Sequence, residues 1–343
     1  MEELISQEEI YLIRQAVRNF VTKEVEPLAA QMEEEDHIPK QLLDKAAEIG
    51  LFGLSSPQEY GGMGAGMLGK VLISEEIGRG PNCFATTIGC HNGIGSVGIV
   101  EFGNHEQKQR YLPKMAAGEL IGAFALTEAS AGSDPSGLKT TAVSKGDKYI
   151  LNGTKLFVTN GGIADVFTVM AVTDKSKGPK GITSFIIEKN FPGFSIGKPE
   201  KKMGLHGNTT TELIFEDCEV PVENVLGELG QGYVNALKIL ANGRAGLAAR
   251  NLGSSQKLLE VSTRYAQQRI QFGKPIFEQQ IIQHYLANMA IEIEALRSLT
   301  YDVARKVDRG ENILKESSIV KVFGSEVYGR VADLAVQIHG GMG

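Results

Sequence analysis

The sequence has few cysteines, no long apolar run and no excess of positive charge, and each absence excludes a class of protein. Its three cysteines, Cys83, Cys90 and Cys218, are spaced neither as a zinc cluster nor as a CxxC redox pair. We therefore expect no metal site and a reducing, cytoplasmic compartment. No apolar run reaches the ~18 residues of a transmembrane helix, and the acidic start MEELISQEEI argues against a targeting peptide. The net charge of −6 provides no global basic surface, so nucleic acid is not an expected partner.

The length and the order of the sequence patterns predict a protein of several domains. The 343 residues, 42% of them hydrophobic, can bury a large core and suggest two or three domains. Helical patterns come first, strand patterns follow, and helical patterns return, without internal repeats. We expect an α+β multidomain fold, with an N-terminal helical domain over residues 1–122, a middle β-barrel domain over 123–231 and a C-terminal helical bundle over 232–343.

The first domain should open with a long amphipathic helix. Apolar residues from Ser6 to about Gln31 fall largely at helical spacing, and Ser6 with Glu9 has the pattern of a capping box. Pro39 and Gly50 have the proline-first, glycine-last order of a short helix. The run PQEYGGMGAGMLG, residues 57–69, contains five glycines and is typical of a turn-rich loop.

The later segments predict strands and then long helices. Short β-branched and aromatic runs lie between turn residues up to about residue 231, and KGDK at 145–148 predicts a hairpin turn. Helical periodicity returns at about 232–268, 276–308 and 311–338. Three such helices leave one apolar face uncovered, and either a further helix or another subunit should close it.

Two segments in the first half could bind a ligand. AFALTEASAGSDPSG, residues 123–137, ends in a turn whose glycine, hydroxyls and amides suit a diphosphate, although composition alone favours an ordinary polar turn. KLFVTNGG, residues 155–162, could set Phe157 against a flat ring and Thr159 near a ring heteroatom. Its alternative interpretation is a core strand that ends in a turn.

Two further segments lie near the ends of expected helices. QQRIQFGKPIFEQQ, residues 267–280, places Arg269 beside Phe272, which suits a phosphate and an adenine. A basic residue at a helix C-terminus is equally expected from the helix dipole. AVQIHGGMG, residues 335–343, contains Gly340 and Gly341, which alone would be an ordinary helix C-cap.

Taken together, these segments resemble the acyl-CoA dehydrogenase family. The resemblance covers essentially the whole chain and depends on LTEASAGSD, LFVTNGG, EVPVENVLGELGQGY, RIQFGK and QIHGGMG in that order. Three runs, LANGR at 240–244, SIVKVFGSE at 318–326 and GGIADVFTV at 161–169, look most like the long-chain and very-long-chain branch.

The resemblance implies that FAD is the cofactor and that the enzyme is a homodimer or homotetramer. Residues expected to line the flavin or face its diphosphate are Phe124, Leu126, Thr127, Gly132, Ser133, Phe157, Val158 and Thr159. Residues expected to reach FAD from the neighbouring subunit are Arg269, Gln271, Phe272, Gln280, Gln337, Gly340 and Gly341.

The family reaction is the α,β-dehydrogenation of acyl-CoA thioesters to trans-2-enoyl-CoA in fatty-acid β-oxidation, with electrons passed to electron-transferring flavoprotein. By the same resemblance, Ser133 and Arg244 lie near the CoA thioester, although an arginine on a helix is more often a solvated or ion-paired group. The nearest alternatives are an acyl-CoA oxidase relative and a non-catalytic assembly protein of the family.

The expected catalytic base is a glutamate in a YEGT-like motif downstream of the paired glycines. The sequence ends at Gly343 before such a motif, so we expect the chain to lack its base and assign no catalytic residue. Glu128 and Glu260 are expected to be a turn or cap group and a helix-surface charge. His91 and His339 are expected to pack or form hydrogen bonds, because neither has a spaced partner for a triad or a metal.

Overall fold

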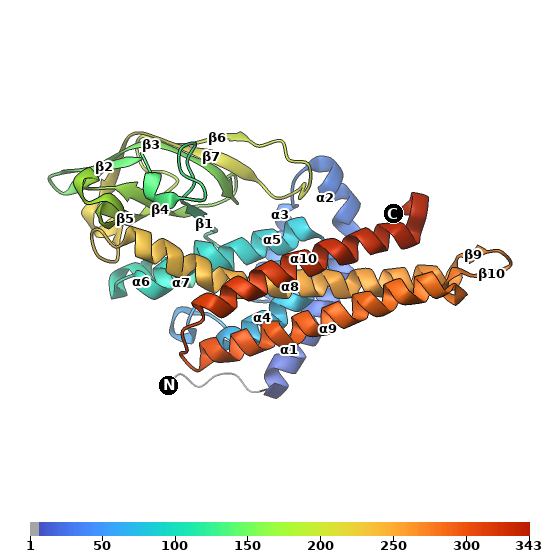
Figure 1. Cartoon of the computed structure of the whole chain (residues 1–343). Coiled ribbons are helices and arrows are strands. Elements are labelled where there is room, and N and C mark those ends of the chain that lie inside the picture. Colours follow the sequence, from blue (N-terminus) through green and yellow to red (C-terminus); the bar gives the residue numbers. More distant parts are fainter. Residues whose placement is uncertain (1–6) are drawn as a thin grey trace. The chain divides into compact units, whose positions relative to one another are not determined.

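The computed structural model describes residues 7–343, which group into two units (Figure 1). Unit 1 comprises residues 28–64 and 86–243, and unit 2 comprises 7–27, 65–85 and 244–343. Helix α8 (Gly232–Gln268) begins in unit 1 and continues into unit 2. The sequence-based domain boundaries at 122 and 231 stay predictions. The capping box predicted at Ser6 lies outside the described residues.

Unit 1 is organised around one eight-stranded sheet, drawn from green to yellow in Figure 1. Its hydrogen-bonded order is β6-β7-β3-β2-β4-β5-β8, and β1 pairs with β4 beside this path. The β1–β4 and β2–β4 pairs are parallel and the others are antiparallel. The strands are β1 (Gly122–Ala125), β2 (Thr141–Lys145), β3 (Lys148–Thr159), β4 (Val166–Val172), β5 (Ile182–Glu188), β6 (Phe194–Pro199), β7 (Thr210–Pro221) and β8 (Val225–Leu226).

The β domain expected from the sequence is therefore confirmed. The predicted KGDK hairpin joins β2 to β3, with Lys145 paired to Lys148 and Gly146 at a φ of +66°. Glycine adopts this left-handed conformation without the steric cost that a Cβ imposes. Within the described residues, the hydrogen-bonded order of the sheet begins at β6 and ends at β8.

The helices of unit 1 follow local sequence signals. Pro39 is the N-cap of α3 (Lys40–Glu48), and Gly50 follows that helix at a φ of +78°, as the proline-first, glycine-last pattern predicts. Asn104 and Gln107 form a capping box at the start of α7 (His105–Ala116). The other α-helices of this unit are α2 (Ala29–Glu35), α6 (Val97–Phe102), the later part of α5 (Asn82–Cys90) and the first part of α8.

Unit 2 is helical, and its long helices confirm the sequence prediction. It contains α1 (Gln7–Phe20), α4 (Gly66–Gly78), the later part of α8, α9 (Gln280–Asp308) and α10 (Leu314–His339). The first helix is shorter than expected, because the chain changes to a π-helix at Val21–Val25 just before Pro27. Proline lacks the N–H that a continuing α-helix needs, and its ring clashes with the preceding turn.

The glycine-rich segment at 57–69 was predicted to be a loop, and for its last residues that prediction is wrong. Residues from Gly66 onward belong to α4, most of which is buried. The carboxylate of Asp308, at the end of α9, accepts hydrogen bonds from the backbone N–H groups of Met67 (2.6 Å) and Leu68 (2.9 Å). A cap supplied from a distant part of the chain thus stabilises a helix start that local sequence disfavours.

Glycines allow α4 and α8 to approach until their backbones touch. A Cβ at Gly253 would lie 1.9 Å from the carbonyl oxygen of Glu75, and a Cβ at Gly78 would lie 2.3 Å from that of Arg250. Contacts this short are impossible for any side chain. The core around this approach includes small and branched residues such as Val71, Ala248 and Leu252.

The helix α4 also carries two buried carboxylates. Glu76 is 1% exposed and accepts hydrogen bonds from Arg14 (Nη2, 2.8 Å) and Arg18 (Nε, 2.8 Å) of α1. Glu75 is 4% exposed and pairs with Arg297 and Tyr301 of α9. Each carboxylate thereby joins α4 to a neighbouring helix, because a buried charge requires charged or hydrogen-bonding partners.

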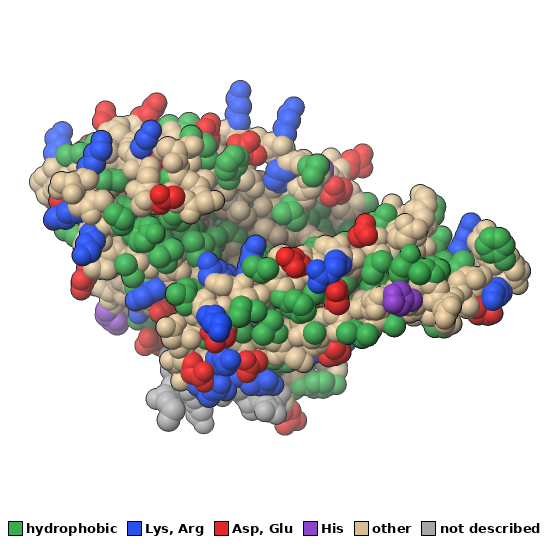
Figure 2. Space-filling model, in the orientation of Figure 1, with side chains coloured by type: hydrophobic (Ala, Val, Ile, Leu, Met, Phe, Trp, Pro, Cys, Tyr) green, Lys and Arg blue, Asp and Glu red, His purple; other side chains and the backbone are tan. Residues whose placement is uncertain are grey.

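The outer faces of α9 and α10 retain exposed hydrophobic side chains. Figure 2 shows these green side chains over the two helices. They are large aliphatic residues that are each more than a third exposed: Ile281, Ile291, Leu314, Ile319, Val322 and Val336. None of the helices described over residues 7–343 is both long and apolar enough to cross a membrane. All three cysteines are buried, and within the described residues none forms a disulfide.

We predict that Gly253→Ala destabilises the protein by about 2 kcal/mol or more, because the new methyl group must push α8 away from the Glu75 carbonyl. Gly246→Ala in the same helix is the matched control, since its Cβ would meet only the Arg250 side chain, at 3.9 Å. Alanine is the better helix former, so this variant should be neutral or more stable. Urea unfolding measures both, and equal effects of the two changes would contradict the close-approach explanation.

Candidate functional site

An irregular stretch of backbone near the end of β3 in unit 1 places an aromatic ring at the surface. Between Lys155 and Val158, β3 advances three residues while β7 advances two, from Leu213 to Thr211, which is a β-bulge. Within the bulge, Phe157 has a φ of +56° and a side chain that is 61% exposed. A bulky residue in the left-handed region is rare and strained, and such strain concentrates at functional sites.

The segment 126–137, which contains the predicted diphosphate turn, lies beside this bulge. The N–H of Leu156 donates to the carbonyl of Thr127 at 2.8 Å. Gly132 and Ser133 are exposed, and a Cβ at Gly132 would meet nothing within 4 Å, so a ligand can approach the backbone there. Asp134 ends the turn by accepting from the backbone N–H of Ser136 (2.9 Å) and from its hydroxyl (2.6 Å). These hydrogen bonds lower the pKa of Asp134.

A buried ion pair connects the turn to the strand. The side chains of Lys155 and Glu128 are 0% and 5% exposed, and their Nζ and Oε1 atoms are 2.6 Å apart. Burial lowers the pKa of Lys155 to about 8, against the opposing effect of Glu128. Burial would raise the pKa of Glu128, but Lys155 and neighbouring hydrogen-bond donors outweigh it, so that pKa is lowered. The prediction that Glu128 is a turn group is confirmed.

Buried amides fix the end of β3. Asn160 is fully buried at a φ of +64°, and its Nδ2 donates to the carbonyl of Thr87 at 3.0 Å. Asn208 donates to the Oδ1 of Asn160 (3.0 Å) and to the hydroxyl of Thr87 (2.8 Å). These amides hold Thr159 at the strand end. The sequence analysis did not single out Asn160 or Lys155. Asn160 could have been recognised, because asparagine is favoured in turns with a left-handed backbone.

The two histidines considered from the sequence have structural roles, as predicted. His91 is buried; its Nδ1 accepts from the N–H of Gly122 at 3.0 Å, and its Nε2 faces the carbonyl of Phe52 at 3.1 Å. His339 stacks on Tyr265 with ring centroids 4.4 Å apart. Within residues 7–343 there is no group of three or more His, Cys, Asp or Glu residues placed to hold a metal ion.

The predicted flavin residues in unit 1 divide by exposure. Phe157, Gly132 and Ser133 are exposed, and Leu126, Thr127 and Thr159 are half-buried, whereas Phe124 and Val158 are buried in the core. The ligand-facing role of this set stays a prediction. The side chains that can reach a ligand lie on β3 and on the turn that is hydrogen-bonded to it.

The residues predicted to reach a neighbouring subunit's flavin all belong to unit 2 and are exposed. Arg269 directly follows α8. The next residues form a hairpin of β9 (Ile270–Gln271) and β10 (Lys274–Pro275), and Figure 1 shows this hairpin projecting from the helices. Phe272 lies at the tip of the hairpin and is 93% exposed. The remaining members are Gln271, Gln280, Gln337, Gly340 and Gly341.

Two charged residues of unit 2 that were considered for chemistry have partners. Arg244 donates from Nη1 to the hydroxyl of Ser318 on α10 at 2.9 Å. Glu260 forms a two-atom ion pair with Arg79, with distances of 3.1 and 2.6 Å. Glu260 was expected to be a helix-surface charge; the structure shows it half-buried and paired with Arg79 from another segment.

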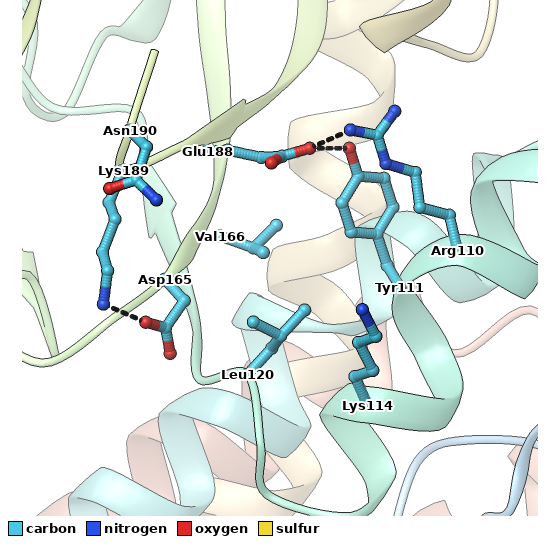
Figure 3. Close-up of a pocket in the computed structure, with 9 residues that line it drawn as sticks. All are labelled: Arg110, Tyr111, Lys114, Leu120, Asp165, Val166, Glu188, Lys189 and Asn190. Carbon is cyan, nitrogen blue, oxygen red and sulfur yellow. Dashed lines mark hydrogen bonds and ion pairs between the residues drawn. The ribbon is translucent and has the colours of Figure 1, made fainter.

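A separate cavity of about 250 Å³ lies between α7 and strands β4 and β5 of unit 1 (Figure 3). Its charged groups largely neutralise one another: Glu188 accepts from Arg110 at 2.6 Å and from the Tyr111 hydroxyl at 2.7 Å, and Lys189 pairs with Asp165. None of the predicted site residues lines it. We interpret it as a structural polar cluster.

Matches to three domain profiles now define the family. Residues 7–119 match "Acyl-CoA dehydrogenase, N-terminal domain", residues 123–218 match the "middle domain" and residues 230–343 match the "C-terminal domain" of the same family. The chain belongs to the acyl-CoA dehydrogenase family, whose members are oxidoreductases that act on CH–CH groups.

Curated relatives cover nearly the whole chain. An acyl-CoA dehydrogenase of Bacillus subtilis is 45% identical over 99% of this chain and 89% of its own. A short-chain specific acyl-CoA dehydrogenase of Clostridium acetobutylicum is 41% identical over 97% of this chain and 88% of its own. The CarC subunit of the caffeyl-CoA reductase–Etf complex of Acetobacterium woodii is 40% identical over 97% of this chain and 88% of its own.

Solved structures share the fold. Butyryl-CoA dehydrogenase from Megasphaera elsdenii superimposes with a TM-score of 0.95 at 39% identity, over 99% of this chain and 90% of that one. A chain from a study of the electron transferring flavoprotein of Acidaminococcus fermentans gives 0.96 at 42% identity, over 99% and 90%. Acyl-CoA dehydrogenase of Bacillus anthracis, complexed with FAD, gives 0.90 at 40% identity, over 98% and 60%.

These relatives correct the chain-length branch inferred from the sequence. The relatives above whose names specify an acyl length are short-chain or butyryl enzymes, not long-chain ones. The runs that suggested the long-chain branch include buried residues such as Val166, Phe167 and Val320, which pack in the cores of their units. Core packing reports fold relationships and does not specify the length of a bound acyl chain.

We predict that Phe157→Asn stabilises the protein in the absence of flavin by about 1 kcal/mol, because asparagine tolerates a positive φ better than phenylalanine. Little apolar burial is lost, since the Phe157 side chain is 61% exposed. Phe157→Leu keeps the strain and should give no gain. Urea unfolding of the flavin-free chains measures this, and equal stability of all three proteins would show that the bulge carries no strain.

Glu128→Gln should lower stability by about 3 kcal/mol at neutral pH, because it leaves the Lys155 ammonium buried without a counter-charge. The lowered pKa of Glu128 means that its contribution is present above the ordinary carboxyl pKa of 4.5 and is lost as the pH falls through the lowered value. The stability difference between the variant and the wild type should therefore shrink in acid. Urea midpoints at neutral and acidic pH measure it, and a pH-independent difference would contradict the ion pair.

Proposed function

We propose that the chain oxidises short-chain acyl-CoA thioesters with FAD bound on the face of unit 1 formed by the β3 bulge and the 126–137 turn. The observation that carries this proposal is the exposed aromatic ring of Phe157, held at a positive φ beside the half-buried Thr159. Aromatic side chains pack favourably against flat rings, and a threonine hydroxyl can donate a hydrogen bond to a ring heteroatom.

The residues on this face fit FAD, which is the cofactor of the family. The ring of Phe157 offers a flat apolar surface, and the open backbone at Gly132 with the Ser133 hydroxyl offers donors to a diphosphate. When bound, FAD accepts the hydride that leaves the substrate. The exposed residues of unit 2, led by Arg269 and Phe272, are proposed to contact the FAD of a neighbouring subunit in a homo-oligomer, as the sequence resemblance implies.

The substrate side of the proposal rests on Ser133 and Arg244. The Ser133 hydroxyl is exposed and can donate to a substrate oxygen, and Arg244 is half-buried with Nη1 bonded to Ser318. We assign no base among the described residues, because Glu128 and Glu260, the two carboxylates considered from the sequence, are committed to ion pairs. The base that the family resemblance implies is a glutamate, which would have to lie within reach of the proton on the carbon beside the thioester.

The proposed acyl length and electron acceptor follow from relatives named as short-chain or butyryl enzymes and as part of an Etf complex. Electron-transferring flavoprotein is therefore the proposed redox partner. The reductase name of the CarC relative favours a second candidate, in which the same site reduces an enoyl-CoA. A cytoplasmic location stays a prediction.

The test is an anaerobic titration of the FAD-loaded chain with butyryl-CoA, with palmitoyl-CoA as the long-chain comparison. Because no base is assigned among the described residues, the readout is the shift of the visible flavin spectrum when the thioester binds, and the proposal predicts this shift at lower concentrations of butyryl-CoA than of palmitoyl-CoA. A shift with palmitoyl-CoA alone would contradict the short-chain assignment, and a chain that retains no FAD would contradict the proposal as a whole.

A companion experiment separates the two directions. The chain is reduced with dithionite, and crotonyl-CoA is added without oxygen. Rapid return of the flavin absorbance together with slow bleaching by butyryl-CoA would favour the reductase, because catalysis would then be adapted to the reverse step. Rapid aerobic reoxidation of the reduced flavin with peroxide formation would instead indicate an oxidase.

A further inference from the structure

The buried amine of Lys155 has a defined set of contacts in unit 1. It lies on β3, two residues before Phe157, and its side chain has no exposed surface. Nζ donates to Glu128 Oε1 at 2.6 Å and to the carbonyl of Leu126 at 3.3 Å. A lysine is rarely buried without a specific role, because transfer of its charge out of water is costly.

The carboxylate of Glu128 in turn closes the loop that carries the turn. It accepts from the backbone N–H of Lys139 at 2.7 Å and from that of Thr140 at 3.1 Å. The backbone of Glu128 also exchanges two hydrogen bonds with Ala131, of 2.9 and 3.0 Å. One carboxylate therefore joins the start of the loop to its end, and the exposed residues Gly132 and Ser133 lie between them.

We propose that Lys155 and Glu128 are positioning residues for FAD, holding the Gly132–Ser133 turn in a fixed place relative to Phe157. The proposal rests on the proposed function of this face. With side chains 0% and 5% exposed, neither residue has surface available to a ligand, so both act through the backbone groups that they bind.

A charged pair does here what an apolar pair of equal size cannot do. Apolar side chains would fill the space, yet they would leave the Leu126 carbonyl and the N–H groups of Lys139 and Thr140 without these partners. Buried ion pairs commonly add little net stability compared with apolar replacements. We infer that the benefit of this pair is the fixed geometry of the turn.

The experiment compares FAD affinity in the wild type and in the double variant Lys155→Met/Glu128→Gln, which removes both charges and so avoids an unpaired buried ion. Flavin fluorescence titration of the apo proteins should give a Kd raised by about tenfold or more, the effect of one or two misplaced hydrogen bonds to the ligand. Lys148→Met is the matched control, since Lys148 lies on the same strand in a more exposed pair with Glu219. Its Kd should not change.

Trypsin digestion of the flavin-free proteins provides a readout that does not depend on FAD. Lys139 is exposed, and its backbone N–H is bound by Glu128, so release of the loop should speed cleavage after Lys139 in the double variant but not in Lys148→Met. If the double variant fails to fold, Glu128→Asp, which keeps the charge but is one methylene shorter, should show both effects in milder form.

The outcomes separate the inference from the function on which it rests. A wild type that binds no FAD would overturn the proposed function, and with it the positioning role toward FAD. A wild type that binds FAD, together with a folded variant of equal Kd and an equal rate of cleavage after Lys139, would overturn the inference alone.

Discussion

A lysine amine that cannot reach solvent must have its charge balanced inside the protein, and in unit 1 this requirement organises the candidate site. Lys155 is balanced by Glu128, and Glu128 also binds the backbone at the far end of its own loop. The strand that carries Phe157 and the loop that carries Gly132 are consequently joined by charge-assisted hydrogen bonds, the stronger class of such bonds in proteins. The positions of the exposed groups follow from contacts that are themselves buried.

Unit 2 depends on a different constraint, the contact between the backbones of α4 and α8. That contact requires Gly78 and Gly253, and it makes α4 a buried helix whose carboxylates, Glu75 and Glu76, must be met by arginines of α1 and α9. The helices in turn support the exposed hairpin at Phe272. Each unit therefore presents one of the two residue sets that the family resemblance associates with FAD, and each set rests on a separately packed core.

Local patterns in the sequence predicted much of this fold, and contacts between distant residues account for the rest. Helical periodicity and turn chemistry were sufficient for α8 to α10 and for the Gly146 hairpin, because those signals are local. The start of α4 was missed because its cap, Asp308, comes from another helix. Motif resemblance singled out Phe157, yet its positive φ depends on pairing with β7. Lys155 was overlooked because a lysine is ordinarily a surface residue.

A crystal structure of the chain with FAD would decide whether FAD binds against the β3 bulge and the 126–137 turn. We predict the flavin ring against Phe157 with a ring heteroatom within hydrogen-bonding reach of the Thr159 hydroxyl, and the diphosphate at Gly132 and Ser133. A flavin bound elsewhere, with Phe157 and the turn left exposed to solvent, would contradict it.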